Sequence, residues 1–268
     1  MTLTRRFVSE RIKPRSPDSH KGDYGHVLVV AGSEAMTGAA YLTALGALRI
    51  GAGLVTVASE ETTRSVVRNR LPEAMTIGFS DIFSYIAQRP ITTLAIGPGL
   101  GIGKKQKTLI LKLLALKLST VLDADGLNNL SLKDLQGANA VLTPHEGELA
   151  HLTGGSRETI HREREVEVKK TAHTFGGICV LKGHRTLISD GRSVRTNSTG
   201  NPAMAAGGMG DVLTGTIAGL LAQGLSLFDA ASAGVYLHGL AGDLAAKSDR
   251  GLLAHELGDA LPSAIQKR

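Results

Sequence analysis

The chain alternates short apolar runs with longer segments of helical periodicity, and this alternation constrains its fold more than any other feature. The apolar runs are residues 27–31, 54–57, 93–96, 120–122, 140–142 and 178–181. Each run is apolar almost throughout, which is typical of strands that are buried on both faces. Such strands, when helices separate them, form parallel sheets covered by helices on both sides. We therefore predict an α/β fold in which a mostly parallel sheet lies between two layers of helices.

Helical periodicity covers five segments, at residues 37–50, 109–118, 209–223, 227–247 and 253–265. Residues 157–170 carry charges of both signs three and four positions apart, which predicts one exposed helix without a functional role. Residues 186–189 and 193–196 flank Asp190-Gly191, which is typical of a two-residue turn in a β-hairpin. The chain therefore adds a hairpin to its repeated strands and helices.

No linker rich in Pro or Ser divides the chain, so we expect a single domain at residues 21–268. The segment before it carries several cations, and we interpret residues 1–20 as a solvated basic arm. These cations are Arg5, Arg6, Arg11, Lys13 and Arg15. An arm of this length is too short to form a further domain.

Composition excludes several classes of protein. Aromatic residues make up 3% of the chain and no nucleic-acid-binding signature accompanies the basic residues, so we expect no nucleic acid partner. No apolar stretch approaches the length of a membrane span and no signal peptide is present, which predicts a cytoplasmic protein without membrane contact. Cys179 lies in an apolar run and is expected to be a buried thiol. The net charge of +6 favours an anionic partner, and we keep a phosphorylated small molecule as the candidate.

Polar and glycine-rich loops follow several predicted strands, at the edge where open α/β sheets bind ligands. Residues 97–101 (Gly-Pro-Gly-Leu-Gly) can lie flat against a ligand, although their spacing matches neither the Rossmann fingerprint nor the P-loop. Small residues at 31–40 either admit a ligand to the backbone amides or pack a helix on the sheet. His145 and Glu148 are expected on one side of a helix that opens at Pro144, and this polar pair favours a functional role.

The most specific segment is residues 197–211, in which Gly207, Gly208 and Gly210 precede an apolar helical pattern. Unobstructed amides at a helix N-terminus form an anion hole. Asp211 lies in the first turn of that helix, where it either caps the helix or takes a proton from an attacking hydroxyl. A carboxylate beside a phosphate site is electrostatically unfavourable unless it has a chemical role, so we favour the general base.

These segments together resemble the ADP-dependent NAD(P)H-hydrate dehydratases, a carbohydrate-kinase-like branch of the ribokinase superfamily. The resemblance runs from Lys21 to the C-terminus and rests on residues 21–22, 31–33, 97–101, 122–127, 143–148, 182–186 and 207–211. It implies a ribokinase-like α/β/α fold and a repair reaction. That reaction is the ADP-dependent dehydration of the S epimer of hydrated NADH or NADPH, with release of AMP and phosphate.

The resemblance also implies roles for single residues. Asp211 would be the catalytic base and would also contact the substrate. The nucleotide-binding residues would be Lys182, Gly183, His184, Arg185, Thr186 and Gly210. The hydrated dinucleotide would contact Ala40, Gly101 and His145 as well.

Cofactors and partners follow from the same resemblance. ADP would be the co-substrate and Mg²⁺ a cofactor. His145 stands where many superfamily kinases have the Asn of an Asn-x-x-Glu metal motif, so a metal role for Glu148 stays open. The resemblance implies a homo-oligomer, with a tetramer as the expectation, and a separate NAD(P)H-hydrate epimerase as functional partner.

Two other functions are compatible with parts of this pattern. A ribokinase-like ATP-dependent kinase of a small alcohol, such as a thiazole or pyrimidine vitamin precursor, would share the fold, but residues 143–148 favour the dehydratase. A non-catalytic adenylate sensor would keep the 182–186 loop without needing Asp211. The pattern does not distinguish ADP from ATP, nor NADH hydrate from NADPH hydrate.

Overall fold

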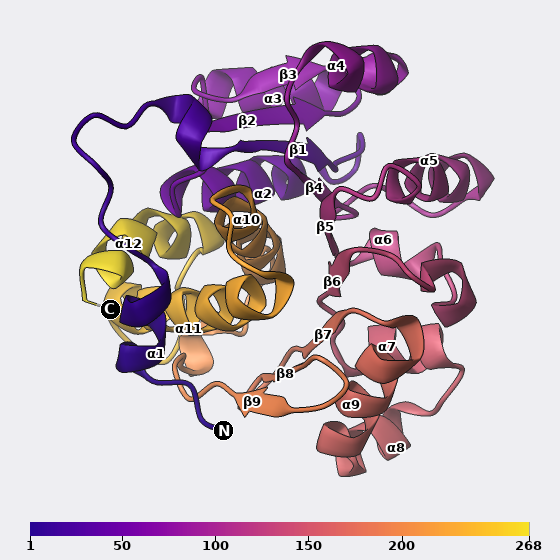
Figure 1. Cartoon of the computed structure of the whole chain (residues 1–268), viewed down its shortest axis with the longest axis vertical. Helices are drawn as coiled ribbons and strands as arrows, with labels where there is room; N and C mark the ends of the chain where they lie inside the picture. The colour runs from indigo at the N-terminus through magenta and orange to yellow at the C-terminus, as the bar shows by residue number, and fades with distance from the viewer. Residues whose placement is uncertain (268) are drawn as a thin grey trace.

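The structure, a computed structural model, describes residues 1–267 and is built around one nine-stranded sheet (Figure 1). The strand order is β3-β2-β1-β4-β5-β6-β7-β8-β9. All neighbours from β3 to β7 pair in parallel, and only the β7–β8 and β8–β9 pairs of the described sheet are antiparallel. The strands are β1 (His26–Val30), β2 (Leu54–Ala58), β3 (Met75–Ile77), β4 (Thr93–Ile96), β5 (Ser119–Leu122), β6 (Ala140–Leu142), β7 (Ile178–Leu181), β8 (Leu187–Ser189) and β9 (Val194–Thr196). The predicted mostly parallel α/β fold is confirmed.

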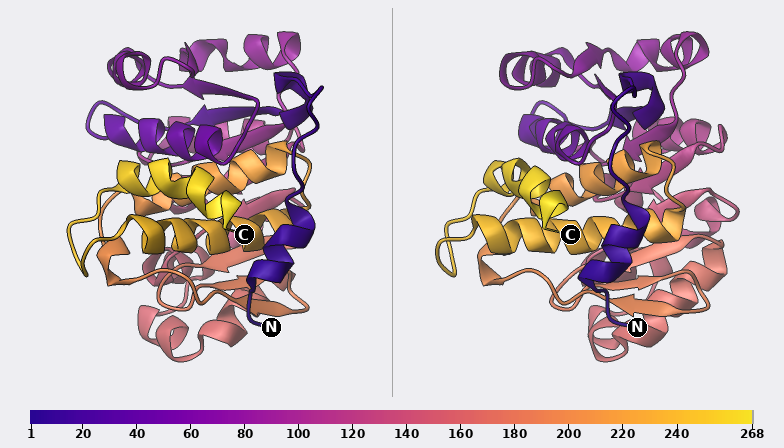
Figure 2. Two further views of the ribbon diagram at one scale, coloured as in Figure 1. Left: turned by 90° about the vertical axis from the view of Figure 1, so that its left-hand side faces the viewer. Right: turned by 60° about the vertical axis from the view of Figure 1, so that its left-hand side comes forward.

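Helices cover both faces of this sheet (Figures 1 and 2). One face carries α2 (Thr37–Arg49), α3 (Glu61–Arg70), α10 (Met209–Ala222), α11 (Leu227–Ala245) and α12 (Ala254–Gln266), and the other carries α4 (Ile82–Gln88), α5 (Lys104–Leu114), α6 (Asp125–Asn128), α7 (Glu146–Thr153), α8 (Arg157–Arg162) and α9 (Arg164–Phe175). Strand β1 shows the division, because Val27 and Val29 join the core under the first layer. Leu28 and Val30 join the core under the second. The three predicted layers are therefore present.

The first layer is packed through glycines. A Cβ atom built at Gly215 of α10 would lie 1.9 Å from the carbonyl oxygen of Thr43 in α2. One built at Gly46 of α2 would lie 2.4 Å from the carbonyl oxygen of Val212. Because two backbones approach this closely, α10 has little freedom to shift against α2, and the start of α10 has a fixed position above the sheet.

The predicted boundaries agree with the structure for most elements. All six predicted strands are present and differ from the observed ones by one residue at most at either end. The helix predicted at 109–118 is wrong in position, because α5 begins five residues earlier, on the polar run 104–107. Strand β3 and helices α3 and α4 were missed. Strand β3 has three partly exposed residues, which leaves too short an apolar pattern to detect.

Two local predictions are wrong. Residues 157–170 form two helices, because Glu163 has non-helical backbone angles (φ −121°, ψ 36°) between α8 and α9. Strands β8 and β9 do pair as a hairpin, but Ser189 pairs with Val194 and the connection therefore has four residues. Asp190 stabilises this longer turn, because its Oδ1 accepts hydrogen bonds from the following backbone N–H groups of Arg192 and Ser193.

The N-terminal segment is not a solvated arm. Leu3, Phe7 and Val8 are buried, and helix α1 (Arg5–Arg11) lies against α11. Leu3 also donates a backbone hydrogen bond to Thr196 of β9 (2.9 Å), so the chain start runs along the end of the sheet. The apolar residues between the cations explain the difference, because they give the segment a face that packs.

Two further predictions concern the thiol and the membrane. Cys179 is fully buried, as expected, and burial raises the pKa of its thiol well above the usual range. Within residues 1–267, no helix has the length and apolar character needed to cross a membrane.

Candidate active site at the carboxyl edge of the sheet

The strand order reverses its direction between β1 and β4, and such a point is where open α/β sheets bind ligands. The loops that follow these two strands are joined, because Gly32 donates a backbone hydrogen bond to the carbonyl of Pro98 (2.8 Å). Ala40 lies just behind them in α2, and its side chain is fully buried. The structure therefore places Ala40 beside the crevice without exposing its side chain.

Gly101 lies in the loop after β4 and is held by helix α6. Its N–H donates to Oδ2 of Asp125 (2.8 Å), and its carbonyl accepts from Nδ2 of Asn129 (2.9 Å). Its φ of +82° requires a left-handed conformation, which favours glycine. A Cβ atom at Gly101 would have only Gln106 within 4 Å among the described residues, so this part of the loop faces open space.

Three side chains from β5, β7 and α10 meet at the centre of the edge. Lys182, just after β7, donates from Nζ to Oδ1 of Asp123 (2.6 Å). Thr214 of α10 donates to Oδ2 of the same carboxylate (2.8 Å). Burial alone would lower the pKa of Lys182, but Asp123 and Glu148 outweigh it and raise that pKa, so the amine stays charged. Asp123 is therefore a buried carboxylate whose two oxygens both accept a hydrogen bond.

The backbone beside Asp123 is strained. Ala124 has φ +47° and ψ −120°, a conformation that L-residues rarely adopt. This bend places two carboxylates on either side of Ala124, with Asp123 at Lys182 and Asp125 at Gly101. Strain of this kind persists where the surrounding contacts enforce it, and it clusters at functional sites.

Asp211 differs from Asp123, although it lies nearby in the first turn of α10. Burial and then the neighbouring charge of Asp123 raise the pKa of Asp211 to about 7, against a smaller opposing effect of Lys182. Within the described chain its carboxylate accepts no hydrogen bond, and Gly208 occupies the cap position of the helix. The capping role is therefore not what the structure shows, and the carboxylate is free to exchange a proton near neutral pH.

His145 and Glu148 form a reciprocal cap at the start of α7. Nδ1 of His145 accepts from the N–H of Glu148 (3.1 Å), while Oε2 of Glu148 accepts from the N–H of His145 (2.8 Å). The helix begins at Glu146, so it opens two residues after Pro144 and His145 is its N-cap. The same Oε2 lies 3.5 Å from Nζ of Lys182, which connects this helix to the central cluster.

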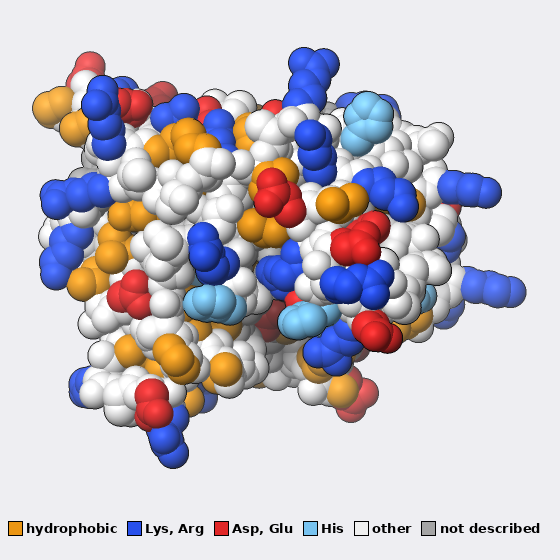
Figure 3. Space-filling view, turned by 90° about the horizontal axis from the view of Figure 1, so that it is seen from below, with side chains coloured by type: hydrophobic (Ala, Val, Ile, Leu, Met, Phe, Trp, Pro, Cys, Tyr) orange, Lys and Arg blue, Asp and Glu red, His pale blue; other side chains and the backbone are white. Residues whose placement is uncertain are grey.

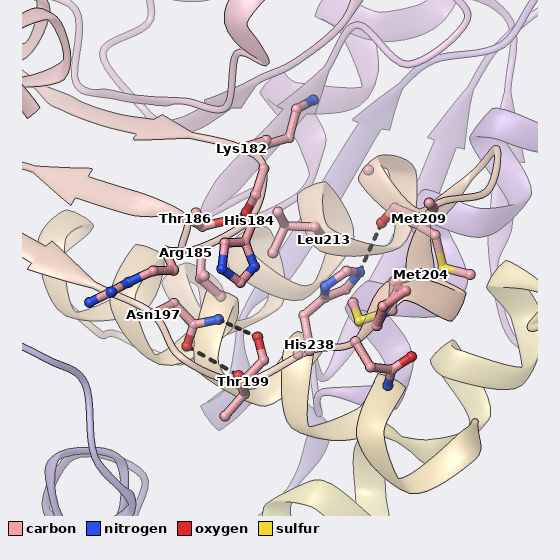
Figure 4. Close-up of a pocket in the computed structure, with 18 residues that line it drawn as sticks. Lys182, His184, Arg185, Thr186, Asn197, Thr199, Met204, Met209, Leu213 and His238 are labelled. Carbon is pink, nitrogen blue, oxygen red and sulfur yellow. Dashed lines mark hydrogen bonds between the residues drawn. The ribbon is translucent and has the colours of Figure 1, made fainter. Parts of the chain in front are cut away.

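A pocket of about 530 Å³ lies beside the start of α10, between the 182–186 loop and helix α11 (Figure 4). All six predicted nucleotide-binding residues line it: Lys182, Gly183, His184, Arg185, Thr186 and Gly210. Its apolar wall includes Met204, Met209, Leu213 and Val235. Figure 4 shows Lys182 pointing away from Asn197 and Thr199, which form mutual hydrogen bonds across the pocket floor. Apolar walls with a few fixed polar groups are typical of small-molecule sites of this size.

His238 of α11 was missed by the sequence analysis and supports the start of α10. Its Nε2 lies 2.9 Å from the carbonyl oxygen of Met209, the first residue of that helix (Figure 4). Burial lowers the pKa of His238 to about 4, so the ring is neutral and donates this hydrogen bond. A lone histidine within an apolar helical pattern carries no signal that distinguishes this role from simple core packing.

The structure thus brings most predicted site residues together. Gly210 joins the loop to the central cluster, because a Cβ atom there would lie 3.5 Å from Nζ of Lys182 and 3.6 Å from Oδ2 of Asp123. His145 lines an adjacent cleft and not the first pocket. Lys182 lines both the cleft and the pocket. Gly101 is connected to the cluster through Asp125, which accepts its N–H and whose charge raises the pKa of Asp211.

The site has no preformed metal cage. Among residues 1–267, no group of three or more His, Cys, Asp or Glu side chains is arranged to hold a metal ion. Both oxygens of Asp123 are already engaged by Lys182 and Thr214. Glu148, whose Oε2 lies 3.5 Å from Nζ of Lys182, and Asp211, which follows Gly210, are two carboxylates that such an ion could use.

A doubly covered parallel sheet with a glycine-rich loop and an aspartate at the start of a helix defines a ribokinase-like protein. The profile of the NAD(P)H-hydrate dehydratase family matches residues 27–263, and the chain belongs to this family. The crystal structure of an ADP/ATP-dependent NAD(P)H-hydrate dehydratase from Bacillus subtilis is similar, with a TM-score of 0.91 and 33% identity over 99% of this chain and 97% of that one.

Two curated relatives show how the chain compares in length. It is 36% identical to an ADP-dependent (S)-NAD(P)H-hydrate dehydratase of Listeria monocytogenes, over 98% of this chain and 96% of the relative. It is 44% identical to a bifunctional NAD(P)H-hydrate repair enzyme of Coxiella burnetii, over 91% of this chain and 51% of the relative. The chain therefore spans about half the length of the bifunctional relatives.

Proposed function

We propose that the chain catalyses the ADP-dependent dehydration of (S)-hydrated NADH and NADPH, which restores the dihydronicotinamide and releases AMP and phosphate. The observation that carries this proposal is Asp211 at the start of α10, a carboxylate with a pKa of about 7 that accepts no hydrogen bond from residues 1–267. It lies one residue from Gly210, which lines the nucleotide pocket. A proton acceptor thus adjoins a phosphate-binding helix start, as phosphoryl transfer to a hydroxyl requires.

The first ligand of this reaction is the nucleotide. The apolar wall of Met204, Leu213 and Val235 suits an adenine ring, and the 182–186 loop supplies the polar contacts to ribose and phosphate. The phosphates would extend toward Gly210, where the first amides of α10 have no intrahelical partner. Lys182 adds a fixed positive charge at that end of the pocket.

The reaction then follows from the positions of these groups. Asp211 accepts the proton of the ring hydroxyl while the hydroxyl oxygen attacks the terminal phosphorus of ADP. AMP departs with the electrons of the broken P–O bond. The amides at the start of α10 stabilise the charge on the transferred phosphoryl group. Phosphate is a better leaving group than hydroxide, so it leaves the ring carbon with the electrons of the C–O bond while the neighbouring carbon loses a proton to solvent water. This elimination restores the ring double bond.

Mg²⁺ fits this site only in part. This ion is usually held by one or two carboxylates together with substrate phosphates and water, and a complete protein cage is not needed. Glu148 and Asp211 are the residues that would contact it. When bound with the nucleotide, the ion would neutralise phosphate charge.

The remaining expectations are part of the same proposal. We propose Ala40, Gly101 and His145 as contacts of the hydrated dinucleotide, since two of them flank the crevice between β1 and β4 and the third lines the adjacent cleft. An NAD(P)H-hydrate epimerase would supply the S epimer, and the bifunctional relatives fit such a partnership. We also propose a homo-oligomer that acts in the cytoplasm, with residues 21–268 and the N-terminal segment that packs on them as one domain.

The test is direct. Purified protein is incubated with hydrated NADH, ADP and Mg²⁺, and the near-ultraviolet absorbance of the dihydronicotinamide is followed while AMP and phosphate are quantified. We expect absorbance to recover with AMP and phosphate in equal amounts. If the absorbance recovers with neither ADP nor ATP, and the chain instead phosphorylates a small thiazole or pyrimidine alcohol with ATP, the proposal is contradicted and the kinase is established. Running ADP and ATP in parallel identifies the donor.

A further inference from the structure

A second cleft lies on the other side of the 182–184 segment from the nucleotide pocket. Its volume is about 620 Å³, and its walls come from the start of α7, from α8 and from the start of α9. Lys182, Gly183 and His184 line both spaces. A ligand in this cleft would therefore lie against the same loop as the nucleotide, but on its opposite face.

The cleft has an excess of positive charge. Its wall contains Arg157, Arg164 and Lys182 and a single carboxylate among the described lining residues, Glu146. That carboxylate is already paired, because Oε1 of Glu146 lies 2.5 Å from Nη1 of Arg164 and 3.1 Å from Nδ1 of His161. Figure 3 shows basic side chains, with histidines among them, across the face of the molecule that includes α8 and α9.

The cations of the cleft differ in what holds them. Arg164 is fixed, since its Nη2 also donates to the carbonyls of Leu181 and Lys182 (3.3 and 3.4 Å). Lys182 is balanced by Asp123 and Glu148. Arg157 is exposed and has neither an ion pair nor a side-chain hydrogen bond to any other residue of 1–267. A guanidinium without a partner at the wall of a cleft is suited to form a bidentate pair of hydrogen bonds with a phosphate.

We propose that this cleft is a phosphate subsite for the hydrated dinucleotide, with Arg157 as the residue that contacts the phosphate. The inference rests on the proposed function. The nucleotide pocket already accounts for ADP, whereas the dinucleotide brings a pyrophosphate and, in its phosphorylated form, a 2′-phosphate. His145 lies at the edge of the cleft, and it connects this subsite to the central cluster through Glu148. Either phosphate of the dinucleotide satisfies the chemistry of the cleft.

The experiment compares Arg157→Ala with Arg162→Ala. Both residues are exposed arginines of α8, but Arg162 is not among the residues that line this cleft, and it pairs with Glu163 (2.9 Å). Its loss therefore changes the charge without removing a wall of the subsite. Binding of NADH and NADPH, the products of the proposed reaction, is measured by their own fluorescence. Turnover is measured separately with the two hydrates and ADP.

We expect Arg157→Ala to weaken binding of the dinucleotide about tenfold or more and to raise its KM by a similar factor, with kcat and the KM for ADP unchanged. Arg162→Ala should match the unsubstituted chain. An equal effect on both dinucleotides identifies the pyrophosphate, and an effect confined to the phosphorylated one identifies the 2′-phosphate.

Three results would overturn the subsite: unchanged binding of both dinucleotides, an effect confined to ADP, or an equal loss in both arginine variants. Arg157→Lys, which keeps the charge, serves as a second variant and should retain most of the binding. The binding measurement does not require turnover, so the two proposals can fail separately. If the unsubstituted chain shows no dehydratase activity but Arg157→Ala still binds NADPH more weakly than it does, the dehydratase is contradicted and the subsite is supported.

Discussion

Helices α10 and α7 each bring a carboxylate to the carboxyl edge of the sheet, but they are held in place by different means. Helix α10 is fixed by steric contact, since Gly215 of α10 and Gly46 of α2 lie against the backbone of the other helix and leave no room for a side chain. Helix α7 is fixed by polar contacts, which are its reciprocal His145–Glu148 cap and the Glu146–Arg164 ion pair. The first arrangement is insensitive to pH and salt, whereas the second is sensitive to both.

The same difference extends to the two carboxylates. Glu148 has an oxygen occupied by the backbone of His145 and lies near Lys182. Asp211 accepts no hydrogen bond within the described chain, and its pKa is about 7. Helix α10 thus carries a carboxylate without a hydrogen-bond donor among residues 1–267, while the Glu148 carboxylate of α7 caps its own helix. Mutations on the two helices should therefore have different signatures.

The largest effect is expected from Asp211→Asn. Asparagine has nearly the same shape but cannot accept the hydroxyl proton, so turnover should fall about 100-fold or more. Folding and ADP binding should persist, because the side chain makes no hydrogen bond that would be lost within residues 1–267. The measurement is kcat with hydrated NADH, together with calorimetric ADP binding. Substantial remaining activity would refute the general base, and an unfolded variant would restore the capping role.

The pH dependence tests the same carboxylate without a mutation. Asp211 must be ionised to act, so kcat/KM, which reports the free enzyme, should fall about tenfold for each pH unit below about 7. Stability should change in the opposite direction. The raised pKa favours the protonated folded state. The stability that protonated Asp211 contributes is therefore lost as pH rises from about 4 to about 7. The melting temperature of Asp211→Asn should therefore exceed that of the unsubstituted chain at about pH 8 and approach it at about pH 5. A flat rate profile across this range would contradict the assignment.

Gly215→Ala tests the steric contact of helix α10. The new Cβ atom would meet the carbonyl of Thr43 at 1.9 Å, so α10 and α2 must separate. We expect a loss of about 1–3 kcal/mol in the free energy of unfolding, which denaturant titration measures. Gly38→Ala is the matched control, because it is exposed in α2 with nothing within 4 Å and should stabilise the helix by about 0.4–1 kcal/mol. Equal effects of the two substitutions would show that the helices do not pack as closely as described.

The smallest effect is expected from Glu146→Gln, which removes the ion pair of Glu146 with Arg164. Burial alone would raise the pKa of Glu146, but His161 and Arg164 outweigh it and lower that pKa. The carboxylate therefore contributes stability above its unfolded pKa, and this contribution is lost as pH falls through the lower folded value. Denaturant titration at neutral pH should show a loss of about 1 kcal/mol, decreasing as salt is added. A loss that is independent of salt would assign Glu146 a packing role instead.

The sequence predicted the fold well, and it predicted that the candidate site residues lie at one edge of the sheet, because both predictions depend on local patterns. Apolar runs between helices specify a parallel sheet, and loops after parallel strands must meet at one edge. The partners within the site were less accessible. Lys182 and Asp123 are 59 positions apart, and Asp123 and Thr214 are 91 apart, so no local spacing connects them. The strained backbone at Ala124 is likewise enforced by tertiary contacts, since alanine does not itself favour a positive φ.

The chain start has a consequence for the behaviour of the protein in concentrated solution. Strand β9 forms the last edge of the sheet, and an edge strand with free backbone groups is a template for pairing with other molecules. Here Thr196 of β9 exchanges backbone hydrogen bonds with Met1 and Leu3, both at 2.9 Å. These residues occupy donors and acceptors that would otherwise recruit a strand from another copy. Displacing them would expose these backbone groups and open this edge to pairing with other copies of the chain.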